Sequence, residues 1–201
     1  MSRLRPRIGI INISGVVVAS NQAASSLSEA GPGRNKMTRD EKLLQDIQCV
    51  EFYLADQFGV MVDFDEGGQN EYWFDPGDDE DAGVISIDSS MDLLEQLYVL
   101  LHEAGHVKIR TQPDFMARFP DSNRHSLSGR IEILREEVAA WNEAALLIDK
   151  FGIARSTHFD EISWRNNYRD ALSKYAQWVA TGDTDTTNFK IALRGPWSRA
   201  I

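Results

Sequence analysis

The sequence predicts an α+β fold, in which a small antiparallel sheet packs on a central helix and three or so further helices complete the domain. Several long segments repeat apolar residues at helical spacing, and shorter segments alternate apolar and polar residues as half-buried strands do. The predicted strands precede most of the helical sequence, which is typical of α+β order. The 201 residues suffice to bury one core without disulfides or oligomerisation.

We divide the chain into three parts. Residues 1–36 form a leader and linker that we expect to be poorly ordered, residues 37–183 the folded domain, and residues 184–201 a C-terminal tail. Arginines and an apolar run open the leader, an order that resembles a weak secretory signal. Polar residues interrupt the run, so we expect a cytoplasmic protein and keep export as the alternative.

The composition excludes several classes of protein. A net charge of -10 and a pI of about 4.8 argue against partners such as nucleic acid or an anionic membrane. No segment approaches the roughly 20 apolar residues of a membrane span. The single cysteine, Cys49, rules out an intramolecular disulfide, and its place among apolar helix positions predicts a buried, unreactive thiol.

The elements of the first half follow in order. A capping box at Thr38 and Glu41 opens a helix that Gly59 ends. Alternation predicts a strand over 60–65, and aromatic and β-branched residues predict further strands over 72–74 and 84–88. The acidic segment 78–81 lacks the ligand spacing of a calcium loop, so we interpret it as a solvated loop.

The next predicted helix carries a His-Glu-x-x-His pattern. It begins near Ser89 or Ser90 as N-cap, and at 3.6 residues per turn His102 and His106 project from one face, so both imidazoles can bind one metal ion. Glu103 lies about 100° round the helix, where it can act on a water held by that metal. Because one dication satisfies all three groups, we predict zinc rather than a structural role.

Catalytic zinc commonly takes a third protein ligand. The motif lacks the additional histidine of a metzincin. The candidates are therefore Glu136 and Glu137, on a later helix opened by Ser128 or Gly129, and the loop residue His125. We assign the apolar stripe of that helix to Ile131, Leu134, Val138, Trp141, Ala145 and Ile148, which does not separate the two glutamates.

Leu100-Leu101-His102-Glu103-Ala104-Gly105-His106, followed by Glu-x-x-Ala at Glu137 and Ala140, resembles the ImmA/IrrE family of metallo-endopeptidases over about residues 38–153. The resemblance implies a zincin-like, gluzincin-like fold. It also implies zinc held by His102, His106 and Glu137, with Glu103 as the catalytic acid/base. After Ala140 this chain has Trp141, where the family more often has Asn or Asp.

The last predicted helix, over 159–179, repeats aromatic residues at helical spacing, which we interpret as a core stripe. Tyr168, Tyr175 and His158 are candidate donors to an oxyanion, but the sequence places none of them at the metal.

The sequence thus predicts a zinc-dependent metallopeptidase that acts on a protein or peptide substrate, with Glu103 as general base of a metal-activated water. One alternative is a non-catalytic regulatory or interaction protein of the same fold that zinc stabilises. Another is a metal hydrolase with a non-peptide substrate. Glu103 favours an enzyme, because a structural site needs no general base.

Overall fold

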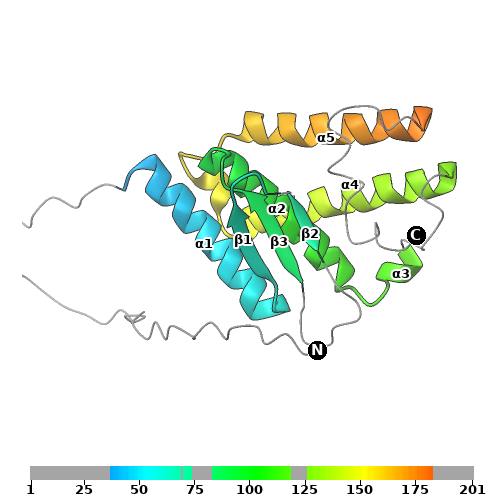
Figure 1. Cartoon of the computed structure of the whole chain (residues 1–201). Helices are drawn as coiled ribbons and strands as arrows, with labels where there is room; N and C mark the ends of the chain where they lie inside the picture. The colour runs from blue at the N-terminus through cyan, green and yellow to red at the C-terminus, as the bar shows by residue number, and fades with distance from the viewer. Residues whose placement is uncertain (1–36, 69, 74–82, 119–125, 183–201) are drawn as a thin grey trace, which may run out of the picture. The chain divides into compact units, whose positions relative to one another are not determined.

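The structure is a computed structural model that describes residues 37–68, 70–73, 83–118 and 126–182. The predicted leader and tail, the acidic segment 78–81 and His125 lie outside the described residues. The α+β class is confirmed (Figure 1). The elements are α1 (Arg39–Phe58), β1 (Met61–Asp65), β2 (Glu71–Trp73), β3 (Val84–Asp88), α2 (Leu93–Arg110), α3 (Phe115–Arg118), α4 (Leu127–Lys150), η1 (Ile153–Arg155) and α5 (Glu161–Thr181).

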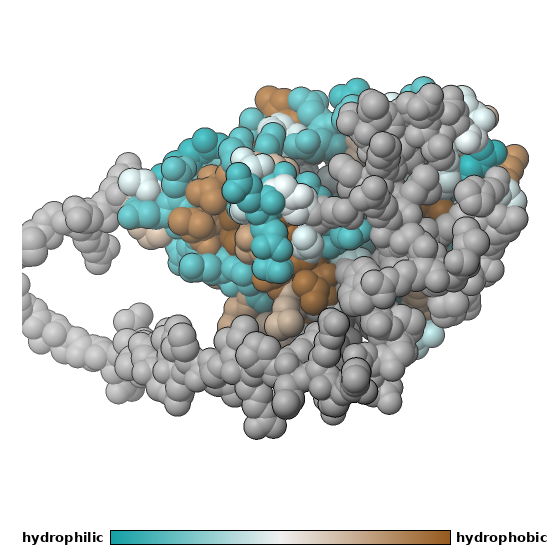
Figure 2. Space-filling model, viewed as in Figure 1, coloured by the Kyte–Doolittle hydropathy of each residue, from teal (hydrophilic) through white to brown (hydrophobic). Residues whose placement is uncertain are grey.

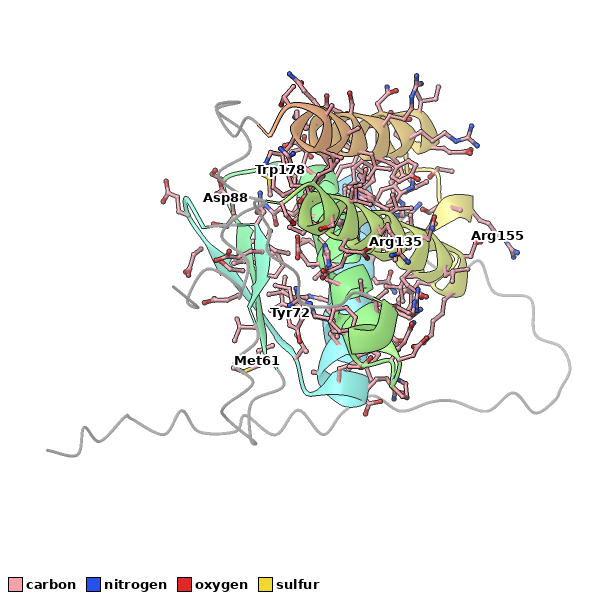
Figure 3. All side chains as sticks on the ribbon, turned by 90° about the vertical axis from the view of Figure 1, so that its right-hand side faces the viewer. Met61, Tyr72, Asp88, Arg135, Arg155 and Trp178 are labelled. Carbon is pink, nitrogen blue, oxygen red and sulfur yellow. The ribbon has the colours of Figure 1, made fainter. Side chains whose placement is uncertain are left out.

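The sheet has the strand order β1-β3-β2, and the prediction of an antiparallel sheet is wrong in part. β2 pairs antiparallel to β3, but β1 pairs parallel to β3. The reason is that the segment after β1 crosses the carboxyl end of β3 instead of forming a hairpin. The N–H of Gly67 donates to Oδ1 of Asp88 (3.0 Å), and the N–H of Ser89 donates to the carbonyl of Asp65 (3.0 Å). Figure 3 shows Met61 and Asp88 at opposite ends of the sheet.

Helix α1 begins and ends as predicted. The N–H of Glu41 donates to Oγ1 of Thr38 (3.2 Å), the Glu41 carboxylate accepts from the N–H of Thr38 (2.7 Å), and Gly59 adopts a left-handed φ of 68°. The buried stripe consists of Leu43, Ile47, Val50 and Leu54. Cys49 lies outside this stripe and is exposed, so the prediction of a buried thiol is wrong.

Helix α2 forms the centre of the fold and packs against the sheet, α1 and α4 (Figure 1). Its N-cap is Asp92, not Ser89 or Ser90, because the Asp92 carboxylate accepts from the N–H groups of both Leu94 and Glu95 (2.9 Å each). Leu97, Leu100, Leu101, Ala104 and Val107 have no exposed surface. The histidine pattern therefore continues directly from the apolar face that fixes α2 in the core.

Helix α4 packs along α2, and α5 packs against α4 (Figure 1). Ser126, two residues before the predicted start, caps α4 by accepting from the N–H of Gly129 (3.0 Å), and Asp160 caps α5. The buried residues of α4 include Glu137, Ala140, Trp141, Ala144, Leu147 and Ile148. This stripe differs from the predicted one, because Ile131 and Ala145 are exposed.

The described surface over α1 and the sheet mixes hydrophilic side chains with apolar patches (Figure 2). Phe52 of α1 and Met61 of β1 are among the exposed apolar residues. Among the described residues, no helix combines the length and apolarity needed to cross a bilayer.

Candidate metal site

The crossing of α2 and α4 brings the candidate ligands together. A Cβ atom added to Gly105 would collide with the backbone carbonyl of Ala140, so the two helices approach more closely than larger side chains allow. Gly105 lies inside the histidine motif, and Ala140 lies one turn after Glu137. Gly105 and Ala140 therefore let α2 and α4 pack closely, and this packing brings a glutamate of α4 to two histidines of α2.

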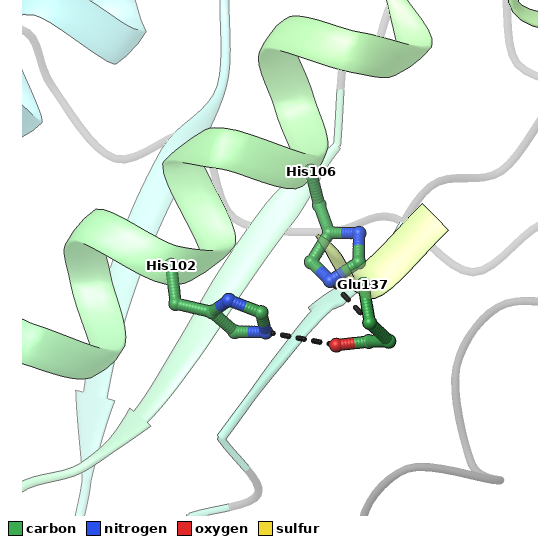
Figure 4. Close-up of side chains that lie close together, drawn as sticks. All are labelled: His102, His106 and Glu137. Atoms are coloured by element: carbon green, nitrogen blue, oxygen red, sulfur yellow. Dashed lines mark ion pairs between the residues drawn. The ribbon is translucent and has the colours of Figure 1, made fainter. Parts of the chain in front are cut away.

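His102, His106 and Glu137 form a cluster that can hold a metal ion. Their ligand atoms all lie within 4.8 Å of one another. Nε2 of His102 is 3.3 Å from Oε2 of Glu137, and Nε2 of His106 is 3.4 Å from Oε1 (Figure 4). Ligand atoms about 2.1 Å from a tetrahedral zinc ion are about 3.4 Å apart. The buried Oε2 atom also has no hydrogen-bond partner among the described residues. Both observations fit a bound cation.

Glu103 lies beside this cluster without joining it. Its side chain is buried, and Oε2 accepts a hydrogen bond from the backbone N–H of Tyr72 in β2 (2.9 Å). Oε1 lies 4.0 Å from Nε2 of His102. Figure 3 shows Tyr72 on the side of the sheet that faces the helices. The sheet thus orients the carboxylate, while the helix position keeps it next to the candidate ligands.

The other nitrogen of His106 faces a second carboxylate. Nδ1 of His106 is 3.6 Å from Oε1 of Glu136, and the same oxygen accepts from Nη2 of Arg110 (3.2 Å). The guanidinium of Arg110 also lies 5.4 Å from the centre of the Tyr72 ring. Glu136 and Glu137 therefore both contact His106, but at opposite nitrogens. Only Glu137 also reaches His102.

Neighbouring charges, more than burial, set the pKa values of His106, Glu137 and Glu136. Burial lowers the pKa of His106, but Glu137 and Glu136 outweigh burial and raise it to about 10. Burial raises the pKa of Glu137, but His106 and His102 outweigh it and hold that pKa below its usual range. Glu136 also has a lowered pKa, because His106 and Arg110 outweigh burial. Without a metal, a protonated His106 between ionised carboxylates balances the charge.

His102 has different neighbours. Its Nδ1 atom is buried and, like Nδ1 of His106, has no hydrogen-bond partner among the described residues. Its ring lies against Trp141 of α4, with centroids 4.3 Å apart and planes 30° apart. Trp141 in turn contacts Trp164 and Tyr168 of α5, with centroids 5.0 and 5.5 Å away. Aromatic packing therefore holds His102.

The three candidate oxyanion donors lie in different places. Tyr175 of α5 donates a hydrogen bond to the Glu137 carboxylate. Tyr168 packs on Trp141 instead. His158 pairs through Nε2 with Oδ2 of Asp46 in α1 (2.6 Å). The structure thus brings Tyr175 to the cluster, and the contacts of Tyr168 and His158 are elsewhere.

The sequence reasoning missed how Glu136, Arg110 and Trp141 act on the histidines. A signal for the first two was present, because Arg110 lies one turn beyond His106 on the same helix face and a carboxylate adjacent to Glu137 can meet it. A signal for the inward position of Glu137 was also present. Ala140, Trp141, Ala144, Leu147 and Ile148 continue from it at helical spacing.

Comparison with known families gives one match: the model of a peptidase family, described as the IrrE N-terminal-like domain, covers residues 55–161. This segment is just over half of the 201 residues and contains the histidine motif, Glu136 and Glu137. Comparisons with curated proteins and with solved structures give no significant match.

Proposed function

Because the chain belongs to the IrrE N-terminal-like peptidase family, as its resemblance to ImmA/IrrE proteins predicted, we propose that it is a zinc-dependent metallopeptidase. Zinc is held by His102, His106 and Glu137, Glu103 is the general base, and the substrate is a protein or peptide. Two imidazoles and one carboxylate are a donor set typical of catalytic zinc, whereas magnesium and calcium prefer oxygen ligands.

One observation carries the proposal: three candidate ligands converge, and the carboxylate of Glu103 lies beside them without joining them. Glu103 is held by the Tyr72 N–H at one oxygen and faces the cluster with the other. A purely structural zinc site is normally closed by four protein ligands and does not need such a carboxylate. Three ligands and an adjacent base support hydrolysis.

The chain's own residues then have distinct tasks. When bound, zinc supplies a water of lowered pKa and polarises the scissile carbonyl. Glu103 accepts the proton of the attacking water at the oxygen that faces the cluster, and later returns it to the leaving amine. The Tyr72 N–H keeps the other oxygen in place. The buried surroundings strengthen these interactions, because they exclude bulk water.

The test compares the wild type with Glu103→Gln and His102→Ala, each loaded with zinc and incubated with a proteome-derived peptide library. Mass spectrometry of new termini measures hydrolysis, and metal analysis measures bound zinc. We expect Glu103→Gln to keep its zinc and to lose hydrolysis by roughly 10²- to 10⁴-fold, because a general base typically contributes that much. His102→Ala should lose both.

Glu103→Gln also serves as the control for a contaminating protease, since it differs from the wild type by one uncharged side chain. Hydrolysis by this variant at the wild-type rate would rule out Glu103 as general base. A wild type that binds zinc but leaves the library uncut would contradict the peptidase proposal.

A further inference from the structure

Helix α5 contributes to the site although it lies beyond the segment that matches the family. The match ends at residue 161, and α5 spans Glu161–Thr181. Its side chains nevertheless reach the cluster on α2 and α4. The contribution of α5 to the site therefore comes from residues outside the matched segment, apart from Glu161 at its start.

The contact at the site comes from Tyr175. The phenol donates a hydrogen bond to the carboxylate of Glu137, the residue that faces both histidines. The phenolic O–H of tyrosine is a hydrogen-bond donor at neutral pH, so it suits a carboxylate acceptor. The hydroxyl lies among the acidic groups of the site.

The position of Tyr175 is fixed by packing along the rest of α5. Trp164 and Tyr168 lie against Trp141, and Trp164 also contacts Tyr98 of α2, with centroids 5.3 Å apart. The Tyr98 hydroxyl donates to the carbonyl of Asp160, the N-cap of α5 (2.7 Å). Because α5 is anchored to both helices that carry the ligands, Tyr175 has a defined place relative to Glu137.

We propose that Tyr175 is a positioning residue of the metal site: its hydroxyl holds the Glu137 carboxylate in the orientation that ligates the metal. This inference rests on the proposed function, because it takes Glu137 as a ligand. A glutamate side chain has three rotatable bonds, and the crossing of α2 and α4 restricts only where it starts. A hydrogen bond to the carboxylate also restricts the position of the end of the side chain. Loss of an outer hydrogen-bond partner of this kind typically lowers metal affinity by about 10- to 100-fold.

The test measures zinc affinity by competition with a chromophoric chelator, for the full chain and for two matched variants. Tyr175→Phe removes the hydroxyl and keeps the ring. Tyr168→Phe makes the same change two turns earlier on α5, where the ring packs on Trp141. We expect Tyr175→Phe to bind zinc about 10- to 100-fold more weakly and Tyr168→Phe to stay within about twofold of the wild type.

Thermal unfolding without metal separates positioning from stability, and both variants should unfold close to the wild type. A Tyr175→Phe variant that binds zinc as tightly as the wild type overturns this inference and leaves the metallopeptidase proposal intact. A wild type that binds no zinc overturns both. The zinc-bound crystal structure gives a second measurement that does not depend on the variant folding. It should place the Tyr175 hydroxyl about 2.5–3.0 Å from a Glu137 oxygen, and a hydroxyl turned away overturns the inference.

Discussion

The two histidines of the motif lie one turn apart on α2 and face the same carboxylate, yet they are held by different forces. Nδ1 of His106 faces Glu136, which Arg110 binds in turn. The Nδ1 atoms of both rings are buried without a hydrogen-bond partner among the described residues, but the ring of His102 lies on Trp141. Charge orients one ring, and packing orients the other.

Two ligands of the same residue type on one helix can therefore have different environments. The Glu136 carboxylate, 3.6 Å from Nδ1 of His106, favours a proton on that nitrogen and so leaves Nε2 for the metal. An aromatic neighbour restricts the ring of His102 but does not select the nitrogen that carries the proton. We therefore expect the two sides to respond differently to changes of charge, of pH and of ring size.

The largest loss of zinc affinity should come from disturbing the close approach of α2 and α4, on which both histidines depend. Gly105→Ala places a methyl group against the Ala140 carbonyl and must push α2 and α4 apart. Overpacking of this kind costs about 1–3 kcal/mol of stability, and the separation of the helices should abolish tight zinc binding. Calorimetric zinc titration and denaturant unfolding measure both. Ala145→Ser, at an exposed position of α4, is the control, and a Gly105→Ala variant with wild-type affinity would show that the close approach is unnecessary.

A smaller effect should follow from a change on the His106 side alone. Glu136→Gln keeps the shape but removes the charge between His106 and Arg110, and we expect zinc affinity to fall about 10- to 100-fold. Glu143→Gln is the matched control, because Glu143 lies on the same helix and pairs with Lys108 (2.5 Å). Equal affinities for the two variants would contradict the role of Glu136.

The pH dependence of the metal-free protein should report His106. Glu137 and Glu136 raise its pKa from 6.5 to about 10 in the fold. Below pH 6.5 the imidazole is protonated in both the folded and the unfolded state, so its ion pairs contribute fully to stability. As the pH rises toward 10 the unfolded chain releases the proton first, and this contribution is lost.

The free energy of unfolding in chelator should therefore fall between pH 6.5 and about 10, and urea titrations measure it. Zinc affinity should rise over the same range, because the neutral imidazole is the ligand. In His106→Gln the fall in stability should be reduced. A wild-type stability that is flat across this window would contradict the pairing.

The smallest loss of zinc affinity should come from a change in the aromatic packing around His102. Trp141→Phe keeps an aromatic ring against the imidazole and changes no charge, so zinc affinity should fall by less than about tenfold. The loss of packing against Trp164 should appear instead as lower stability. If Trp141→Phe weakened zinc binding more than Glu136→Gln does, the contrast between the two histidines would be reversed.

The fold and the site differ in how far sequence reasoning could reach. Helical periodicity places His102, His106 and Glu103 correctly on one stretch of helix, because the geometry of a single helix is local. The alternation in β1 and β3 predicts strands but carries no information about their direction. Their parallel pairing follows from the crossing of the intervening segment over the end of β3.

Contacts between α2, α4 and α5 are harder to predict, because they depend on how each helix is rotated about its axis. Choosing between Glu136 and Glu137 needs the rotation of α4, and a stripe drawn through Val138 and Ala145 misjudges that rotation. Tyr175 is far along the chain from Glu137, and its spacing in α5 equals that of any core aromatic. Only the packed structure distinguishes Tyr175 from the other aromatic residues of α5.

A crystal structure of the zinc-loaded protein, with anomalous scattering measured at the zinc edge, would show which residues bind the metal. We expect one zinc ion within about 2.0–2.2 Å of Nε2 of His102, Nε2 of His106 and a carboxylate oxygen of Glu137. Glu136 should remain at Nδ1 of His106. Zinc bound through Glu136, or a site that lacks either histidine, would contradict this expectation.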